Sequence, residues 1–239
     1  MTEQLDPLYD KTIKCLVCDN TFTTKKVRSR FGLSRHMESD FFTEYIYQKE
    51  DIDPLLYYVC VCPSCGYSFS EEASTYFIPG TKQQIMENIT RKWQGHEHFC
   101  YERTTKEAID SYKLGIYSGN LKKERPIVMG GLHMRLAWVY RRLNKEEEEK
   151  RFSEYALQAY EKSYFDGDYK DSSMSAIRLT YLIGELYRKF ENYQKASSYF
   201  SKLIHIKQPT KDKRFIEMAR DQWYVMREDQ RSGKAPKLK

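Results

Sequence analysis

Two short segments of this chain share a cysteine pattern that is typical of metal binding. Cys15 and Cys18 are separated by two residues, as are Cys62 and Cys65, and each pair is followed four residues later by phenylalanine. A Cys-x-x-Cys turn brings two thiolates to one ion, and two such turns supply the four ligands of a closed, structural zinc site. The sequence therefore predicts one Zn2+ held by Cys15, Cys18, Cys62 and Cys65, with no open position for catalysis.

Other residues compete for a place in this site. The two pairs are separated by 43 residues, more than the roughly 15 to 20 of common zinc-binding spacings, so the intervening stretch must have structure of its own. Cys60 would share a strand face with Cys62 and is a rival ligand, although a buried strand residue is the simpler interpretation. His36 and Asp40 are weaker substitutes. The alternative to zinc is a set of reduced, buried cysteines or a redox pair.

The stretch between the two cysteine pairs carries two further signals. Residues 55–61 are apolar and β-prone, which predicts a buried strand leading into the second turn. Basic side chains interleaved with an aromatic ring could follow a phosphate backbone, so nucleic-acid binding is the alternative function. These residues are Lys25, Lys26, Arg28, Arg30 and Arg35 around Phe31. The acidic residues that follow, Glu38, Asp40 and Glu44, dilute this basic arm.

The second half of the chain has the pattern of paired helices. In residues 178–209, Gly184, Tyr187, Ala196 and Phe200 fall at the spacings of a tetratricopeptide repeat. An earlier unit repeats the theme with seven inserted residues, about two helical turns, which can lengthen both helices without rotating the apolar face. Its corresponding residues are Leu136, Ala137, Tyr140, Ala156 and Tyr160.

Further elements complete this helical half. A helix is expected over residues 81–93, followed by one that contains Ala108 and Tyr112. A closing amphipathic helix is expected around Trp223, because the last hairpin of an array cannot cover its own apolar face; it contains Phe215, Met218, Ala219 and Met226. We interpret Gly130-Gly131 as a helix start or linker and residues 96–100 as a surface loop.

The predicted fold class is α+β, with a small N-terminal zinc-binding β-rich module followed by an all-α tetratricopeptide-like helical array. The expected division is a zinc-ribbon-like module with an inserted arm at 1–78, helical repeats with a capping helix at 79–230, and a basic disordered tail at 231–239. The whole chain resembles the bacterial family catalogued as domain of unknown function 2225. The resemblance rests on residues 15–18, 61–67, 135–141 and 181–188. It implies the same arrangement of the two halves and no particular activity.

Composition limits the class of protein. Apolar residues make up 40% of the 239, enough for a core, and there is no apolar run long enough to span a membrane. The first residues lack the basic start and apolar stretch of a signal peptide, so a cytoplasmic location is expected. In a reducing compartment, paired cysteines favour metal binding over disulfides. Residues 1–75 carry eight Lys and Arg against 12 Asp and Glu, whereas the rest carries 32 against 22.

The basic helical half suggests where a partner would bind. In a tetratricopeptide array the first helix of each hairpin lines the concave face, and clustered arginines with aromatic rings suit an acidic peptide or protein partner. The predicted partner-binding residues are Met134, Trp138, Arg141, Arg142, Arg178, Tyr181, Arg188 and Lys189. The alternative is that the aromatic residues pack between helices and the arginines are solvated.

These features favour a non-catalytic binding or adaptor protein. The sequence contains no phosphate-cradling glycine-rich loop, no His-Glu-x-x-His motif and no nucleophile elbow, so an enzyme is not expected. A thiol redox sensor is a less favoured alternative, since zinc thiolates can oxidise and release their metal.

Overall fold

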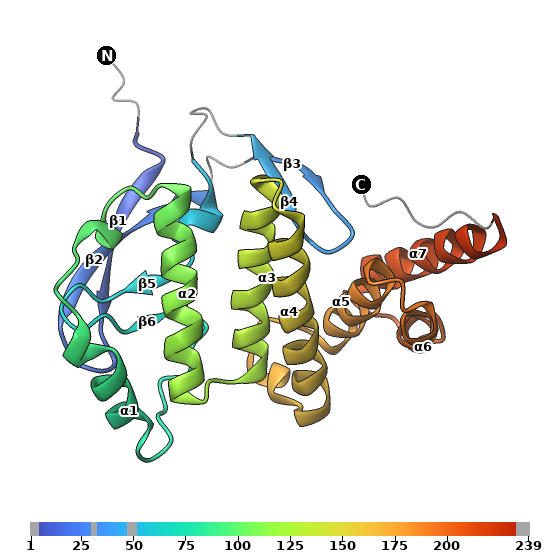
Figure 1. The fold of residues 1–239 in the computed structure, drawn as a ribbon. Coiled ribbons are helices and arrows are strands. Elements are labelled where there is room, and N and C mark those ends of the chain that lie inside the picture. Colours follow the sequence, from blue (N-terminus) through green and yellow to red (C-terminus); the bar gives the residue numbers. More distant parts are fainter. Residues whose placement is uncertain (1–4, 30–32, 47–51, 233–239) are drawn as a thin grey trace.

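The protein, seen in a computed structural model, is mixed α+β, with small antiparallel sheets at its N-terminal end and a mostly helical remainder. The structure describes residues 5–29, 33–46 and 52–232. Figure 1 shows the elements in a row, with the strands β1, β2, β5 and β6 at one end, upright helices in the middle, and α7 at the other end.

The strands form three two-stranded antiparallel pairs. In the first pair, Leu8 lies opposite Val27 and Lys14 opposite Thr21. In the last and shortest pair, Cys60 lies opposite Phe69. The pairs are β1 (Leu8–Lys14) with β2 (Thr21–Val27), β3 (Leu33–Met37) with β4 (Thr43–Ile46), and β5 (Cys60–Val61) with β6 (Ser68–Phe69).

The strand expected over residues 55–61 is largely wrong, because a 3-10 helix occupies Pro54–Tyr57 and only Cys60–Val61 is extended. The Asp53 side chain accepts a hydrogen bond from the Leu55 N–H at 2.9 Å. Proline at the first helical position has a suitable φ and no N–H to lose. These two local signals outweigh the β preference of the following aromatic residues.

The helical part begins with α1, which is shorter than expected. This helix spans Thr81–Asn88, and a 3-10 turn follows at Thr90–Lys92. The remaining helices are α2 (Thr105–Lys122), α3 (Pro126–Arg142), α4 (Glu146–Asp166), α5 (Ala176–Lys189), α6 (Tyr193–Ile204) and α7 (Lys213–Ser232). The closing helix is thus confirmed. The loop expected over residues 96–100 contains a 3-10 turn that buries Phe99 and Cys100.

The helix boundaries follow ordinary capping chemistry. Thr104 and Glu107 form a complete capping box at the start of α2. Pro126 occupies the first turn of α3, and the Asn192 side chain caps α6 by accepting from the Lys195 N–H. Gly167, with a φ of 76°, ends α4 in the left-handed conformation that glycine adopts without strain.

Gly130 and Gly131 lie inside α3 and are not the helix start or linker expected from the sequence. A side chain at Gly130 would place its Cβ 2.5 Å from the Tyr160 ring. Gly184 in α5 similarly faces Phe200, with a virtual Cβ 2.8 Å from that ring. Glycine therefore allows an aromatic ring of the second helix to approach the first helix in both hairpins.

Buried side chains link the elements from end to end. One core cluster contains three of the four predicted ligand cysteines, Cys15, Cys62 and Cys65, together with Ile85 and Ile89, so α1 packs on the cysteine turns across the expected boundary at residue 78. A second cluster joins Val59 to α2 and α3, and a third spans α3 to α7. α7 extends to Ser232, and the rest of the expected tail lies outside the described residues.

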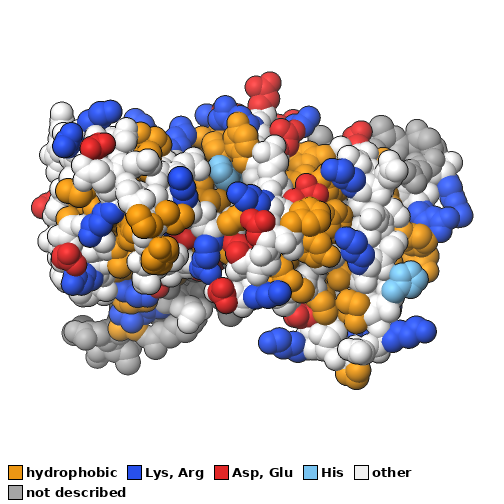
Figure 2. All heavy atoms as spheres, turned by 90° about the horizontal axis from the view of Figure 1, so that it is seen from below, with side chains coloured by type: hydrophobic (Ala, Val, Ile, Leu, Met, Phe, Trp, Pro, Cys, Tyr) orange, Lys and Arg blue, Asp and Glu red, His pale blue; other side chains and the backbone are white. Residues whose placement is uncertain are grey.

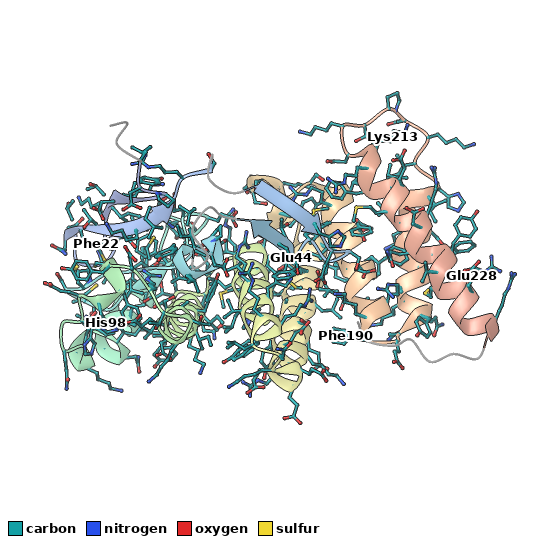
Figure 3. All side chains as sticks on the ribbon, turned by 90° about the horizontal axis from the view of Figure 1, so that it is seen from above. Phe22, Glu44, His98, Phe190, Lys213 and Glu228 are labelled. Atoms are coloured by element: carbon teal, nitrogen blue, oxygen red, sulfur yellow. The ribbon has the colours of Figure 1, made fainter. Side chains whose placement is uncertain are left out.

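The β3–β4 hairpin lies apart from the other strands and against the helices. Figure 3 shows Glu44 of this hairpin over the helices, between Phe22 at one end of the molecule and α7, marked by Lys213 and Glu228, at the other. The hairpin thus brings residues of the N-terminal segment to the second half of the chain.

Within the described segments, no helix is both long enough and apolar enough to cross a bilayer.

His133 in α3 gives the helical core a pH dependence that can be measured. Burial lowers its pKa from 6.5 to about 4, and its Nδ1 has no hydrogen-bond partner within the described segments. As the pH falls, the unfolded chain therefore takes up a proton on His133 near pH 6.5, whereas the folded chain takes it up only near pH 4. Stability is complete above this pH and falls as the pH drops toward 4.

We expect His133 to lower the free energy of unfolding by about 2 kcal/mol when the pH falls from 7 to 4.5. Urea unfolding of wild type and His133→Phe at both pH values measures this cost as the difference in their pH responses. Phenylalanine suits the site, because the imidazole already lies 6.1 Å from the Phe152 ring. Equal pH responses of the two proteins would contradict the prediction.

Candidate metal centre and the α3–α5 face

The first cysteine turn follows directly after β1. The Cys15 N–H donates to the Asn20 carbonyl at 2.8 Å, and the Asp19 N–H donates to the Cys15 carbonyl at 3.1 Å. Asp19 has a φ of 59°, a left-handed conformation that aspartate tolerates better than most residues. The Val17 N–H points at the Cys15 sulfur, 3.4 Å away, so the backbone supports a negative charge on that thiolate.

The second turn, between β5 and β6, repeats these bonds. The Cys62 N–H donates to the Tyr67 carbonyl at 3.0 Å, and the Gly66 N–H donates to the Cys62 carbonyl at 2.9 Å. Gly66 has a φ of 74°, and a Cβ there would lie 2.5 Å from the Trp93 ring. The Trp93 indole also donates to the Pro63 carbonyl at 2.7 Å, which fixes the turn from outside.

The two turns bring the four sulfurs together. The ligand atoms of Cys15, Cys18, Cys62 and Cys65 all lie within 4.8 Å of one another. Sulfurs of opposite turns are close, with Cys15 to Cys65 at 3.5 Å and Cys18 to Cys62 at 3.6 Å. Zinc–sulfur bonds of about 2.3 Å in a tetrahedron require sulfur separations of about 3.8 Å. The cluster is therefore able to bind a metal ion, and its donor set and spacing fit Zn2+.

Hydrogen bonding among the sulfurs shows why a cation suits this cluster. Bonds from Cys15 and Cys65 lower the pKa of Cys62, whereas the bond to Cys62 raises the pKa of Cys15 to about 12. One thiolate is stabilised by neighbours that keep their protons. All four can ionise together only when a cation balances their charges, so metal binding must release protons.

The rival ligands lie outside this cluster. Cys60 is fully buried in β5 and belongs to the surrounding core. Among the described residues, the sulfurs of the two turns form the one group of metal-ligating side chains of this kind. Asp40 is bound to basic side chains elsewhere, and His36 lies in β3 of the separate hairpin.

The predicted partner-binding residues are brought to one region, but the β3–β4 hairpin already covers much of it. We call this surface of α3 and α5 the α3–α5 face, made of Trp138, Arg141, Arg142, Arg178, Tyr181, Arg188 and Lys189. We call residues 38–42, between the two strands of the hairpin, the tip. Met134, also predicted to bind a partner, is 1% exposed within the core, so it has no free surface to offer.

Acidic side chains of the tip pair with basic residues of the face. The Arg141 guanidinium bonds both carboxylate oxygens of Asp40 and reaches Glu38 at 2.7 Å. Lys189 Nζ lies 2.8 Å from Asp40, and Glu149 of α4 accepts from Arg141 at 2.7 Å. The acidic groups that this face was predicted to bind are thus supplied by carboxylates of the same chain.

Burial and charge act in opposite directions on the tip carboxylates. Burial alone would raise the pKa of Asp40, but Lys189 and Arg141 outweigh it and hold that pKa well below its usual range. For Glu38, burial dominates over Arg141 and raises the pKa. Asp40 is therefore the firmly ionised member of the pair.

Aromatic rings of the tip pack on the same face. Phe41 stacks on Tyr181 with ring centroids 5.5 Å apart, and the Arg178 guanidinium lies 5.6 Å from the Phe41 ring. Phe42 is 4% exposed and lies 6.1 Å from the Trp138 ring. The tip therefore fills the face with apolar as well as charged contacts.

Polar bonds complete the contact at Ser39. Its hydroxyl donates to Glu185, a fully buried carboxylate of α5. Arg188 binds the same carboxylate at 2.7 Å, and the Tyr181 hydroxyl donates to the Ser39 carbonyl at 2.8 Å. Ser39 was not predicted from the sequence, and Glu38 and Asp40 were expected to dilute a basic arm, with Asp40 also a weak substitute for a metal ligand.

Arg142 contacts both Asp53 and the Phe42 ring of the tip. It pairs with Asp53 at 2.6 Å, and its guanidinium lies 5.4 Å from the Phe42 ring. Arg141, Arg142, Arg188 and Lys189 thus each pair with a carboxylate of the chain, whereas Arg178 lies against the Phe41 ring.

The basic arm of the nucleic-acid alternative is also largely paired. Lys25 lies 3.0 Å from Asp10, and Lys26 lies 3.1 Å from Glu71. Arg28 donates to the Asp6 carbonyl at 3.1 Å. Arg30, Phe31 and the side chain of Arg35 lie outside the described residues.

Comparison with known proteins places the chain in a family. Residues 8–226 match the family described as "Uncharacterized protein conserved in bacteria (DUF2225)". The chain belongs to this family. This DUF2225 protein is also similar to an uncharacterized protein from Borreliella burgdorferi (strain ATCC 35210 / DSM 4680 / CIP 102532 / B31), 30% identical over 158 residues. That match covers 59% of this chain and 55% of the relative. No solved structure matches.

Proposed function

We propose that this DUF2225 protein is a non-catalytic, zinc-containing binding protein whose α3–α5 face recognises an acidic, aromatic segment of a partner protein. The observation that carries the proposal is the seating of the tip. Asp40 is fully buried between Arg141 and Lys189, and Phe41 and Phe42 pack beside it. The face therefore has the chemistry to hold such a segment.

The zinc part of the proposal rests on the four sulfurs. Four cysteine ligands leave no position for substrate, so the metal would stabilise the fold and take no part in a reaction. Thiols kept free for a metal suit a reducing compartment such as the cytoplasm.

The helical part is proposed to be tetratricopeptide-like. Two antiparallel hairpins, α3–α4 and α5–α6, each place a glycine of the first helix against an aromatic ring of the second. Small residues at such positions allow the close approach that stacked helical hairpins need.

Nucleic-acid binding remains the second candidate, and its support is weaker. Lys25 and Lys26 are paired with carboxylates. Figure 2 shows basic and acidic side chains interspersed on the face of the molecule seen from below. A duplex or single strand is bound best by a continuous basic surface.

Peptide binding by a variant with a weakened tip tests the proposal. Asp40→Asn combined with Phe41→Ala removes one charge and one ring from the tip and frees Arg141, Lys189 and Tyr181. We expect this variant to bind a fluorescent peptide with the sequence of residues 37–44, and fluorescence anisotropy to show saturation.

The matched control is the same peptide with its aspartate changed to asparagine and its two phenylalanines to alanine. We expect it to bind at least about tenfold more weakly, since it lacks the charge-assisted bonds and stacked rings. Equal binding of the two peptides, or no binding of either, would refute recognition by this face.

A further inference from the structure

The tip makes an imperfect match with the face that it covers. The indole Nε1 of Trp138 and the Nε of Arg178 are buried, and neither has an acceptor among the described residues. Phe41 also has a φ of 72°, in the left-handed region that is unfavourable for a bulky side chain. Buried donors without acceptors oppose docking of the tip. The left-handed Phe41 is a cost of the tip's own turn, in which the Phe41 N–H donates to the Glu38 carbonyl.

The favourable contacts are those that any segment of similar chemistry could make. The face bonds Asp40 and Glu38 through their carboxylates, and it holds Phe41 and Phe42 through their rings. A partner segment with a carboxylate followed by two aromatic residues could repeat them without the positive φ. If it also offered acceptors to Trp138 and Arg178, it would satisfy donors that the tip leaves unpaired.

We propose that the tip is a built-in occupant of the α3–α5 face, and that a partner protein binds by displacing it with an acidic segment that ends in two aromatic residues. This inference rests on the proposed function and adds its regulation. The partner's affinity is set by competition, because only molecules with an undocked tip are competent to bind.

Ser39 offers a single-residue means of releasing the tip. Its hydroxyl donates to the fully buried Glu185. Ser39→Asp places a second carboxylate against Glu185, which disfavours the docked tip. The asparagine of Ser39→Asn has nearly the same shape as the aspartate of Ser39→Asp, but it is uncharged and its amide can still donate to Glu185. This pair therefore separates the effect of charge from the effect of size.

The experiment measures anisotropy of the labelled peptide of residues 37–44 with full-length wild type, Ser39→Asp and Ser39→Asn. Hydrogen exchange of residues 38–42 reports tip release in each protein. We expect faster exchange and at least about tenfold tighter peptide binding in Ser39→Asp, as for a face that is occupied in nine molecules of ten. Ser39→Asn should resemble wild type in both measurements.

The other outcomes separate this inference from the proposed function. Equal affinities for wild type, Ser39→Asp and the Asp40→Asn/Phe41→Ala variant would overturn competition by the tip and leave peptide recognition standing. No binding to any of them would overturn both proposals. If Ser39→Asp keeps its tip docked or unfolds, the comparison of wild type with the Asp40→Asn/Phe41→Ala variant decides in its place.

Discussion

Removal of the metal is expected to unfold the N-terminal end of the molecule and to leave α3 to α7 folded. Structural zinc sites contribute about 10–16 kcal/mol of apparent binding energy in small zinc-binding peptides, which is as large as the whole free energy of unfolding of a typical domain. The cysteine turns, α1 and Trp93 depend on this centre through their shared core and the Gly66 contact. The third core cluster, from α3 to α7, contains none of these cysteines.

The measurement combines metal analysis with spectroscopy. Protein purified under reducing conditions without chelator should contain about one zinc per chain. After chelation, circular dichroism should retain most of the helical signal, while the environment of Trp93 becomes exposed. A cooperative loss of all helical signal would show that the whole molecule depends on the metal, and absence of zinc from the purified protein would refute the metal site.

Two cysteine substitutions form a matched pair for this prediction. Cys62→Ser removes one of the four clustered sulfurs, so we expect loss of zinc and the same partial unfolding as chelation. Cys60→Ser makes the same chemical change at a fully buried cysteine outside the cluster. It should keep the metal, and loss of zinc from Cys60→Ser would mean that the fourth ligand is misassigned.

The candidate metal centre could be predicted from the sequence because the residues that form each turn are close together in the chain. Each turn contains its own two cysteines, and the residue after the second cysteine, Asp19 or Gly66, adopts the left-handed conformation that the turn requires. The phenylalanines four residues after each pair, Phe22 and Phe69, are both buried beside the sulfurs. A repeated short motif thus specified both halves of one site.

The paired helices were predictable because helical spacing is also a local pattern. This pattern did not identify which residues of two helices meet, nor did it separate a strand from a short helical turn. Helical spacing matched Ala137 of the earlier hairpin to Gly184, which faces Phe200, but the glycine that faces an aromatic ring there is Gly130, two turns before Ala137. The notion that residues 55–61 form one strand failed because an apolar run alone does not distinguish a strand from a turn of helix. There the capping aspartate and the proline were decisive.

The position of the tip could not be predicted from local pattern. Asp40 is separated from Arg141 by 101 positions and from Lys189 by 149, and no spacing rule joins such residues. The imbalance of charge was visible, with an acidic N-terminal segment and a basic helical half. It predicted an acidic partner for the helices, and the chain itself contains a segment of that kind.

Loss of Arg141 is the second large effect that we expect. Arg141→Met keeps much of the side-chain volume but leaves Asp40, which is fully buried, with Lys189 as its remaining cation. Removing one partner of a buried ion pair typically costs about 3–5 kcal/mol, because the other charge stays desolvated. Urea unfolding at pH 7 should therefore show a loss of this order.

A double-mutant cycle identifies the origin of that loss. Asp40→Asn removes the charge that Arg141→Met leaves unbalanced, so the double variant should be more stable than the sum of the single losses predicts. Arg142→Met is the matched control, since Arg142 is more exposed than Arg141, and it should cost less. A loss below about 1 kcal/mol for Arg141→Met would be typical of a solvent-exposed pair. It would mean that Asp40 leaves its buried position readily, and additive effects in the cycle would show that the two side chains do not depend on each other.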